Sequence, residues 1–333
     1  MRAAVVRLPG GPEVIQFEEL PLPELPSGWV RIRIKAIGLS RSEIYARRGE
    51  YPEVAFPRVL GTECVGVIEE HADQPSDDPA TLTLSQGTSV VALMGGLGRL
   101  YDGCYAEYVV APATQVLPLT TTLPWDILAA VPKSYLTALQ ALETLDLRPG
   151  HTLLIRGGAS SVGLCAITLA KERGAYIFAT TRTPDKVGAL HAAGADQVIL
   201  DTGSIEAQVL HTAPDGVSAV LELVGATTLR DSLLTVAPSG ILCYMGNLGD
   251  HSVLERFQPL ADIPSGVRLT TYASRATIDA AHCTQLLQRI VDGVATGRYP
   301  THLDRVFSFE QLVEAHRYME DNRATGKVVV SAT

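Results

Sequence analysis

Residues 153–164 of the chain read Leu-Leu-Ile-Arg-Gly-Gly-Ala-Ser-Ser-Val-Gly-Leu. A short apolar run enters a turn of small residues, and an apolar run at helical spacing leaves it. This pattern predicts a strand over 152–156 and a helix over 162–173. Glycine allows the tight turn at Gly158, and Gly163 allows the helix to lie close to the strand. The alternative interpretation is an ordinary tight turn between a strand and a helix.

The start of such a helix offers unpaired backbone N–H groups and positive potential to a phosphate, and serine hydroxyls add further donors. Glycines at a strand–turn–helix junction within an alternating region are typical of dinucleotide-binding domains. We therefore predict a pyrophosphate site made by this turn and the first helical residues, namely Gly158, Ala159, Ser160, Ser161, Val162 and Gly163.

The sequence around the turn alternates short apolar runs with amphipathic helices. A helix over 127–145 leads into the region, and further strands are expected at 176–180, 197–200, 219–223, 241–245 and 268–272. Strict alternation of this kind is typical of βαβ units and a parallel sheet. The expected fold class is therefore α/β, with a doubly wound parallel Rossmann sheet.

The first third and the last part of the chain have a different pattern. Residues 30–37 alternate apolar and charged side chains with period two, which predicts a half-buried strand. Short strands are also expected at 65–69, 89–93 and 106–111. The tail combines two helical stretches with a terminal strand, at 278–296, 309–322 and 327–330. These parts predict a second, β-rich domain.

Charge and hydropathy argue against two classes of partner. The 333 residues include 27 basic and 36 acidic side chains, for a net charge of −9. No basic cluster suits the neutralisation of nucleic-acid phosphates. No apolar stretch approaches the roughly 20 residues that span a bilayer, and the N-terminus has no signal-peptide pattern. We expect a cytoplasmic protein that binds neither nucleic acid nor membrane.

The cysteines and histidines show no metal-binding pattern. The five cysteines are odd in number and far apart, and the eight histidines are scattered. Each cysteine is therefore expected to be a small buried apolar residue. The positions are Cys64, Cys104, Cys165, Cys243 and Cys283.

The end of the second strand of the parallel sheet decides which dinucleotide is expected. An acidic residue at this point commonly binds the ribose 2′-hydroxyl of NAD, but this chain has no carboxylate there before Asp185. Thr181, Arg182 and Lys186 instead provide a hydroxyl and two cations, which suit a 2′-phosphate. We therefore predict NADPH in preference to NADH.

Together these features resemble the medium-chain dehydrogenase/reductase superfamily. The β-rich first part, the Gly-Gly-Ala-Ser-Ser-Val-Gly turn and the terminal Gly-Lys-Val-Val-Val at 326–330 carry the resemblance over the whole chain. It is strongest to the zinc-independent quinone oxidoreductase and enoyl reductase branch. The resemblance implies a GroES-like catalytic domain built from residues 1–123 and 275–333. It also implies a Rossmann NADP-binding domain over 124–274, and a homodimer.

Departures from the zinc-dependent branch of the family argue against a catalytic zinc ion. Ser40 stands at the cysteine position of the Gly-x-Cys motif, and Thr62 stands at the histidine position of Gly-His-Glu. The four-cysteine lobe that binds structural zinc in that branch is absent. Hydroxyl groups are poor zinc ligands compared with thiolates and imidazoles. We expect no metal site, which argues against oxidation of an alcohol substrate.

The stretch after Ser40 supplies the expected catalytic side chains. Quinone oxidoreductases carry a similar Asp-x-Tyr-x-Arg-x-Gly-x-Tyr-Pro loop. Tyr45 and Tyr51 match its tyrosines, while Glu43 replaces its aspartate. Tyr45 is the first candidate to donate a hydrogen bond to the substrate oxygen and Tyr51 the second, although each could be a partly buried aromatic side chain. Arg41 could polarise a carbonyl group, but a salt bridge is the more common role for such a residue.

Further residues are assigned to the cofactor site. The resemblance implies that Thr137 reaches the nicotinamide carboxamide or the ribose. Gly225 and residues 246–248 follow strands of the parallel sheet, and ligands bind at that edge of open α/β sheets. This second set comprises Gly225, Gly246, Asn247 and Leu248, with Asn322 and Lys327 from the terminal segment.

The predicted function is that of an NADPH-dependent oxidoreductase. It would transfer hydride, without zinc, to a quinone or to the C=C bond of an α,β-unsaturated carbonyl compound. In such a reaction the cofactor carries the hydride, and the protein supplies position and electrostatics. Three alternatives remain open: a non-catalytic NADPH-binding protein of the crystallin type, a trans-acting enoyl reductase of a biosynthetic pathway, and a zinc-free alcohol dehydrogenase.

Overall fold

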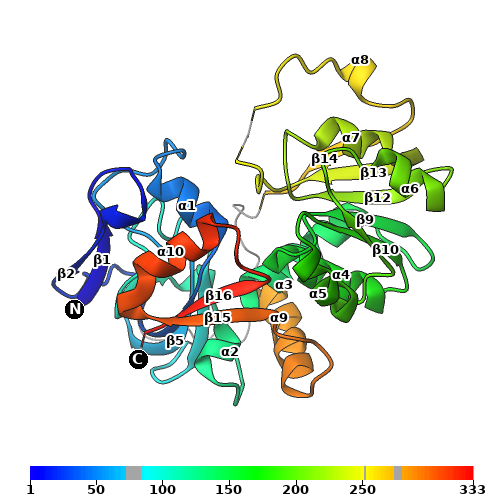
Figure 1. Ribbon diagram of the computed structural model, residues 1–333. Helices are drawn as coiled ribbons and strands as arrows, with labels where there is room; N and C mark the ends of the chain where they lie inside the picture. Colours follow the sequence, from blue (N-terminus) through cyan, green and yellow to red (C-terminus); the bar gives the residue numbers. More distant parts are fainter. Residues whose placement is uncertain (73–83, 251–252, 274–279, 333) are drawn as a thin grey trace. The chain divides into compact units, whose positions relative to one another are not determined.

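The computed structural model describes residues 1–72, 84–250, 253–273 and 280–332 (Figure 1). Contacts within the chain divide it into two compact units. The first unit is formed by Met1–Leu136 with Ser274–Thr333, and the second by Thr137–Ala273. The second unit thus begins inside a helix, whereas the sequence placed the domain boundary at residue 124.

The second unit contains a sheet of six parallel strands. These are β9 (Thr152–Arg156), β10 (Tyr176–Thr181), β11 (Gln197–Leu200), β12 (Val217–Glu222), β13 (Val236–Tyr244) and β14 (Arg268–Thr271). Their order across the sheet is β11-β10-β9-β12-β13-β14, so the chain starts at the centre and fills one side before the other. This is the strand order of a doubly wound Rossmann fold, and it confirms the fold class predicted for this part of the chain.

The parallel sheet forms because its strands are apolar on both faces. Leu154, Phe178, Val220 and Leu242, one from each of four neighbouring strands, lie in a single buried cluster. Strands covered on both sides have this composition because the connecting helices pack against each face. The connecting helices are α4 (Ser161–Glu172), α5 (Val187–Ala193), α6 (Glu206–Thr212), α7 (Leu229–Leu234) and α8 (Pro259–Asp262).

The first unit is the β-rich part that the sequence predicted. Its larger sheet contains β3 (Trp29–Gly38), β5 (Glu63–His71), β6 (Ser89–Leu93), β7 (Tyr108–Pro112), β8 (Val116–Pro118), β15 (Leu303–Ser308) and β16 (Lys327–Ser331). The order is β15-β16-β3-β5-β6-β8, and β7 pairs with β3. A smaller sheet joins β1 (Arg2–Val6), β2 (Ile15–Glu19) and β4 (Arg58–Val59).

The two ends of the chain meet in the larger sheet. Strand β16 pairs antiparallel with β3, and Val329 lies opposite Gly38. Helices α9 (Ala280–Ala295) and α10 (Leu312–Glu320) belong to the same unit. Strand β15 was not expected from the sequence, because most of its side chains are exposed or half-buried and no alternating apolar pattern marks it.

Two helix predictions were wrong in detail. The helix expected over 127–145 is two helices, α2 (Trp125–Ala129) and α3 (Pro132–Thr144). Pro132 starts the second one, because proline fits the first helical position and does not fit a helix interior. The stretch after Ser40, expected as a loop, is helix α1 (Arg41–Arg47), in which Ser40 and Glu43 form a capping box.

The five cysteines are free and buried, as predicted. In the described ranges, no helix combines the length and the apolar composition that a membrane crossing requires.

Candidate functional site

The turn after β9 is built on glycine and serine. The residue with positive φ, +85°, is Gly157 and not Gly158 as predicted. Ser160 is the N-cap of α4: its Oγ accepts a hydrogen bond from the Gly163 N–H at 3.1 Å and donates to the Gly157 carbonyl at 2.9 Å. A Cβ atom on Gly163 would lie 2.6 Å from the Gly158 oxygen, so this position requires glycine.

The turn leaves the helix start open for an anion. Ala159, Ser160, Ser161 and Val162 are half-buried, and α4 has twelve residues. The backbone N–H groups of the first turn have no partner within the helix, and the helix dipole adds positive potential there. This arrangement fits the pyrophosphate site that the sequence predicted.

Two other predicted loops lie beside this turn at the carboxyl edge of the sheet. A Cβ atom on Gly225, which has φ +117°, would lie 3.1 Å from the Asn247 Oδ1 and the Gly246 carbonyl. A Cβ atom on Gly157 would lie 3.0 Å from the Leu248 side chain. The structure therefore brings the turn, Gly225 and the 246–248 stretch together at the carboxyl ends of the neighbouring strands β9 and β12. The order in which the chain adds strands reverses between these two strands, and ligands bind at this point in such sheets.

Thr137 carries a buried hydroxyl that fits a ligand. It lies on α3 with 6% of its surface exposed, and its Oγ1 has no hydrogen-bond partner among the described residues. Helical threonines usually bond to the carbonyl four residues earlier, and a buried hydroxyl without a partner is destabilising. A nicotinamide carboxamide or ribose, as predicted, would provide the missing partner.

The end of β10 carries the predicted cations. Arg182 is exposed and Lys186 is half-buried, whereas Thr181 is buried and its hydroxyl bonds to the Thr183 backbone. The carboxylate of Asp201, whose backbone N–H bonds to the Thr181 carbonyl, accepts a hydrogen bond from Arg156 at 2.8 Å. This acidic group is therefore engaged with Arg156.

Beneath the turn lies a buried polar cluster that sequence reasoning missed. Arg156 is 0% exposed and also donates to Asp231 at 2.6 Å. Glu222 is likewise buried; its Oε1 accepts the N–H groups of Val224 and Gly225 at 2.7 and 3.0 Å and so shapes that turn. Burial raises the pKa of Glu222 above its ordinary value. For Asp201 burial acts in the same sense, but the Arg156 guanidinium outweighs it and holds the pKa below its usual value.

In the first unit the two predicted tyrosines lie together. Tyr45 on α1 is 6% exposed, and its ring meets the half-buried Tyr51 edge-on with centroids 6.3 Å apart. The Arg99 guanidinium lies 4.2 Å from the centre of the Tyr51 ring and pairs with Glu53 at 3.6 Å. Of the two tyrosines, Tyr51 thus contacts a cation, and the catalytic roles of both stay predictions.

Three other predicted residues have partners inside the first unit. Arg41 donates to the Met319 carbonyl at 3.1 Å and to Asn322 Oδ1 at 2.9 Å, which ties α1 to the end of α10. Lys327 is 2% exposed, and its ammonium contacts Glu63 Oε2 at 2.5 Å. These contacts give Arg41, Asn322 and Lys327 structural roles, and their predicted contacts with substrate or cofactor stay predictions.

A second buried polar cluster surrounds Thr62. The Thr62 hydroxyl donates to Glu43 Oε1 at 2.7 Å and accepts a hydrogen bond from the Lys133 ammonium at 2.5 Å. Glu43 also accepts from the Ser40 N–H at 2.7 Å and from the Tyr105 hydroxyl at 3.0 Å. Burial opposes the charge of Glu43, but Lys133 and the hydrogen bonds lower its pKa. Burial lowers the pKa of Lys133 to about 8.

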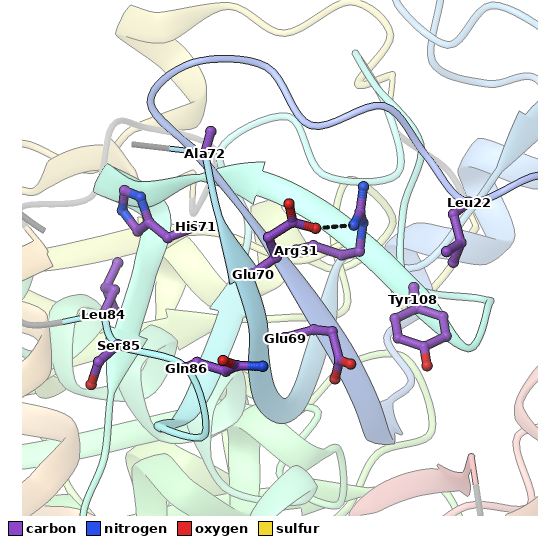
Figure 2. Close-up of a pocket in the computed structure, with 10 residues that line it drawn as sticks. All are labelled: Leu22, Arg31, Glu69, Glu70, His71, Ala72, Leu84, Ser85, Gln86 and Tyr108. Carbon is purple, nitrogen blue, oxygen red and sulfur yellow. Dashed lines mark hydrogen bonds and ion pairs between the residues drawn. The ribbon is translucent and has the colours of Figure 1, made fainter. Parts of the chain in front are cut away.

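An open depression elsewhere in the first unit does not contain these residues. Figure 2 shows an open depression of about 760 Å³ lined by Arg31 of β3, the end of β5 and Tyr108 of β7. Its most polar feature is an ion pair between Arg31 and Glu70. None of the predicted catalytic or cofactor residues lines it, so it does not change the assignment of the site.

Comparison with known proteins agrees with this geometry. Residues 26–121 match the alcohol dehydrogenase GroES-like domain, and residues 193–330 match the family described as zinc-binding dehydrogenase. The chain is 28% identical to a quinone oxidoreductase of Pseudomonas aeruginosa, with 96% of each chain covered. It is 26% identical to a 2-haloacrylate reductase of a Burkholderia species, with 98% of each covered.

The chain belongs to the medium-chain dehydrogenase/reductase superfamily. Within the superfamily it lies in the quinone oxidoreductase and enoyl reductase branch, as the sequence features suggested. Among solved structures, a mycobacterial protein complexed with NADPH superposes with a TM-score of 0.86 at 27% identity over 100% of both chains. A protein described as an NAD-dependent alcohol dehydrogenase gives a TM-score of 0.86 at 29% identity, also over 100% of both.

In this medium-chain dehydrogenase/reductase the residues at the two zinc-ligand positions do not fit zinc. Ser40 and Thr62 offer only hydroxyls, and the Thr62 hydroxyl already bonds to an ammonium group and a carboxylate. The Lys133 ammonium therefore already stands beside Thr62, and its positive charge opposes the binding of a metal ion there. Across the described ranges, no three His, Cys, Asp or Glu side chains are grouped so that they could hold a metal ion.

Sequence reasoning assigned no role to four charged residues that belong to the two polar clusters. Glu43, Lys133, Arg156 and Glu222 are charged side chains inside apolar or helical runs. A charge at such a position is the available signal, because an ionised side chain is rarely buried without a partner. The sequence does not say which residue the partner is.

Proposed function

We propose that the protein is an NADPH-dependent oxidoreductase that reduces a quinone or the C=C bond of an α,β-unsaturated carbonyl compound, without zinc. The observation that carries the proposal is the carboxyl edge of the parallel sheet. There the glycine turn stands beside Arg182 and Lys186, while the neighbouring Asp201 is bound to Arg156. The exposed Arg182 guanidinium and the Lys186 ammonium, at and just after the end of β10, favour a cofactor with a 2′-phosphate.

The residues of the second unit are assigned to holding the cofactor. The N–H groups at the start of α4 bind the pyrophosphate, and Arg182 and Lys186 bind the 2′-phosphate. The Thr137 hydroxyl orients the nicotinamide end. When bound, the reduced nicotinamide supplies the hydride. In the first unit, Tyr45 and Tyr51 are the aromatic side chains assigned to the substrate.

The relatives support the choice of reaction. Relatives similar over their full length include one named quinone oxidoreductase and one named 2-haloacrylate reductase, and both names are consistent with reduction of an electron-poor conjugated compound. The NADPH-bound neighbour supports the cofactor, and the neighbour described as NAD-dependent makes NADH the comparison to test.

The test is turnover by the purified protein. NADPH or NADH is mixed with a panel of benzoquinones, naphthoquinones, enones and acrylates, and the loss of reduced-nicotinamide absorbance is followed. We expect oxidation of NADPH with at least one class of acceptor and a lower rate with NADH. Binding of NADPH with no turnover over the whole panel would favour the non-catalytic alternative.

A further inference from the structure

Lys133 lies at the start of a helix, and its side-chain ammonium points into the polar cluster around Thr62. It is the second residue of α3, and its backbone N–H donates to Glu63 Oε1 at 2.7 Å. Its ammonium donates to the Thr62 hydroxyl at 2.5 Å. An ammonium group has three donors, and in the described ranges the other two have no protein acceptor within hydrogen-bond distance.

The direction of the hydrogen bonds around Thr62 is determined by chemistry. Lysine only donates, so the Thr62 oxygen accepts from it and the Thr62 proton goes to Glu43 Oε1, 2.7 Å away. Glu43 is 0% exposed and receives further hydrogen bonds from the Thr62 N–H at 2.9 Å and from Tyr105. The carboxylate is thus fully engaged and holds the hydroxyl, and through it the ammonium, in one orientation.

The charge of Lys133 is not neutralised by a direct ion pair. Glu63 accepts a hydrogen bond from the Lys133 backbone N–H only, and its other oxygen pairs with the Lys327 ammonium at 2.5 Å. Lys327 and Arg99 both add positive potential at Lys133, which opposes its protonation, while Glu43 and Glu63 favour it. A cation in such a surrounding gains from a further anionic or electron-rich partner.

The position of Lys133 on its helix connects it to the cofactor assignment. Lys133 and Thr137 are four residues apart on α3, and residues at this spacing lie on the same side of a helix. Thr137 carries the partnerless buried hydroxyl assigned to the nicotinamide end. Lys133 therefore lies one helical turn before Thr137, the residue assigned to the nicotinamide end.

We propose that Lys133 is the electrophilic residue of the reduction: its ammonium donates a hydrogen bond to the carbonyl or quinone oxygen of the substrate. It would take the part that the zinc ion plays in the metal-dependent branch, beside the same Thr62 position. Thr62 and Glu43 are positioning residues that hold the ammonium. This inference rests on the proposed function, because it assigns a role within that reaction.

For an enone, the proposed reduction adds one hydride and one proton across the C=C bond. The substrate β-carbon would receive a hydride, with its electron pair, from a bound reduced nicotinamide, which would thereby be oxidised. The π electrons of the C=C bond shift toward the carbonyl and form an enolate, whose oxygen accepts the Lys133 N–H hydrogen bond. The α-carbon then takes a proton from water. Stabilisation of the oxyanion by a fixed donor is a large contribution to catalysis in such reactions.

The test compares Lys133→Met, which removes the charge, with Lys133→Arg, which retains it. Lys171→Met is the matched control, because Lys171 is an exposed lysine paired with Asp196 on the far end of α4. We expect Lys133→Met to lower kcat about 100-fold or more, the effect of losing one oxyanion donor. NADPH affinity should stay within about 2-fold of that of the parent chain, and Lys133→Arg should recover at least about 10-fold of kcat.

A second readout does not depend on turnover. In the presence of NADP⁺, 4-nitrophenol is used as an oxyanion probe, and its ionisation is followed by absorbance. The parent protein and Lys133→Arg should bind it as the phenolate at a pH where the free phenol is largely protonated, whereas Lys133→Met should not. Failure of the parent protein to bind or ionise the probe, or a Lys133→Met variant with kcat within about 3-fold of the parent, would overturn the inference.

The two readouts also separate the inference from the proposed function. A parent protein that reduces no acceptor but ionises the bound phenol contradicts the proposed function and supports an oxyanion site at Lys133. A parent protein that reduces acceptors equally well with methionine at position 133 supports the proposed function and overturns the role of Lys133.

Discussion

Several buried polar side chains of this protein are each held by more than one partner. His316 of α10 shows how completely one such residue is specified. Its Nδ1 faces Arg47 Nη1 at 2.9 Å, and because arginine only donates, this nitrogen carries no proton. Its Nε2 lies 2.9 Å from the Tyr105 hydroxyl, which in turn donates to Glu43. The chain of hydrogen bonds therefore runs from Arg47 to the carboxylate that holds Thr62, and it requires a neutral imidazole.

This requirement predicts a pH dependence of stability. Burial, followed by the nearby Arg47 charge, lowers the pKa of His316 from 6.5 to about 3. The unfolded chain therefore takes up a proton below pH 6.5 that the folded chain does not bind until about pH 3. The contribution to stability is present above pH 6.5 and is lost as the pH falls, by up to about 1.4 kcal/mol per pH unit.

The variant His316→Gln isolates this effect. Its amide can accept from Arg47 and donate to Tyr105, but it does not titrate. We expect the free energy of unfolding, measured with urea between pH 7 and 4, to fall less steeply for the variant than for the parent chain. All other titrating groups are common to both proteins, so parallel curves would contradict the prediction.

At the same scale, Arg182 should decide the choice of cofactor. Arg182→Ala removes a charge-assisted hydrogen bond to the 2′-phosphate, which is worth about 1.5–3 kcal/mol. The KM for NADPH should therefore rise by about 10- to 100-fold, and the KM for NADH should not change. Lys171→Met, on the same unit but at the end of α4 far from the glycine turn, should change neither value. Equal effects on the two cofactors would show that Arg182 does not face the 2′-phosphate.

At the start of helix α4, the backbone of Gly163 packs directly against the backbone of the turn that follows β9. The Cα of Gly163 approaches the carbonyl oxygens of Gly158 and Gly157, and a Cβ atom there would lie 2.6 and 2.7 Å from them. These contacts hold the first turn of α4 against the strand, and they aim its N–H groups at the site. Gly188 in α5 is a contrast, since no atom lies within 4 Å of a Cβ added there.

Alanine at these two glycines should therefore have opposite effects. Gly163→Ala should destabilise the protein by about 1–3 kcal/mol through overpacking and should weaken NADPH binding. Gly188→Ala should leave binding unchanged and stabilise by up to about 1 kcal/mol, because alanine is the better helix former. Urea unfolding and a fluorescence titration with NADPH measure both. A Gly163→Ala variant with normal affinity would show that the turn tolerates displacement.

At the scale of the whole molecule, the Rossmann sheet ends in an unpaired strand. β14 pairs with β13 alone among the described strands, and Arg268 and Thr271 are exposed. An exposed edge strand is a ready surface for pairing with a second chain. We propose that two copies join along β14, in agreement with the homodimer that the family resemblance implied.

A single added charge on β14 tests whether this edge strand forms the dimer interface. In a symmetric dimer Thr271→Asp places two like charges at the same interface, which should shift the protein from dimer to monomer. Thr202→Asp adds the same charge on an exposed loop of the same unit and should leave the dimer intact. Size-exclusion chromatography with light scattering measures the mass. A parent chain that is already monomeric, or a Thr271→Asp variant that stays dimeric, would contradict the proposed interface.

The amino-acid sequence by itself determined the parallel sheet, the glycine turn on it and the cations beside it. These features depend on side chains close together along the chain, where apolar periodicity and the position of glycine act directly on the backbone. It also gave the tyrosines and the hydroxyls at the zinc positions, because they lie in one continuous stretch or in a short motif. The wrong predictions from the sequence were also local. Helix α1, which begins with a capping box, was expected as a loop, and the start of α3 at Pro132 was not expected.

Only the tertiary structure decided which buried charges meet. Lys133 bonds to Thr62, 71 positions away, and Lys327 bonds to Glu63, 264 positions away. Such pairs leave no periodic trace, because a hydrogen bond requires proximity in space and no particular spacing in the chain. In the low-dielectric interior a buried charge without a partner is strongly destabilising. Which partner each charge contacts depends on how β3, β5, β16 and α3 pack together. The ammonium beside Thr62 is therefore a property of the fold and not of any single segment.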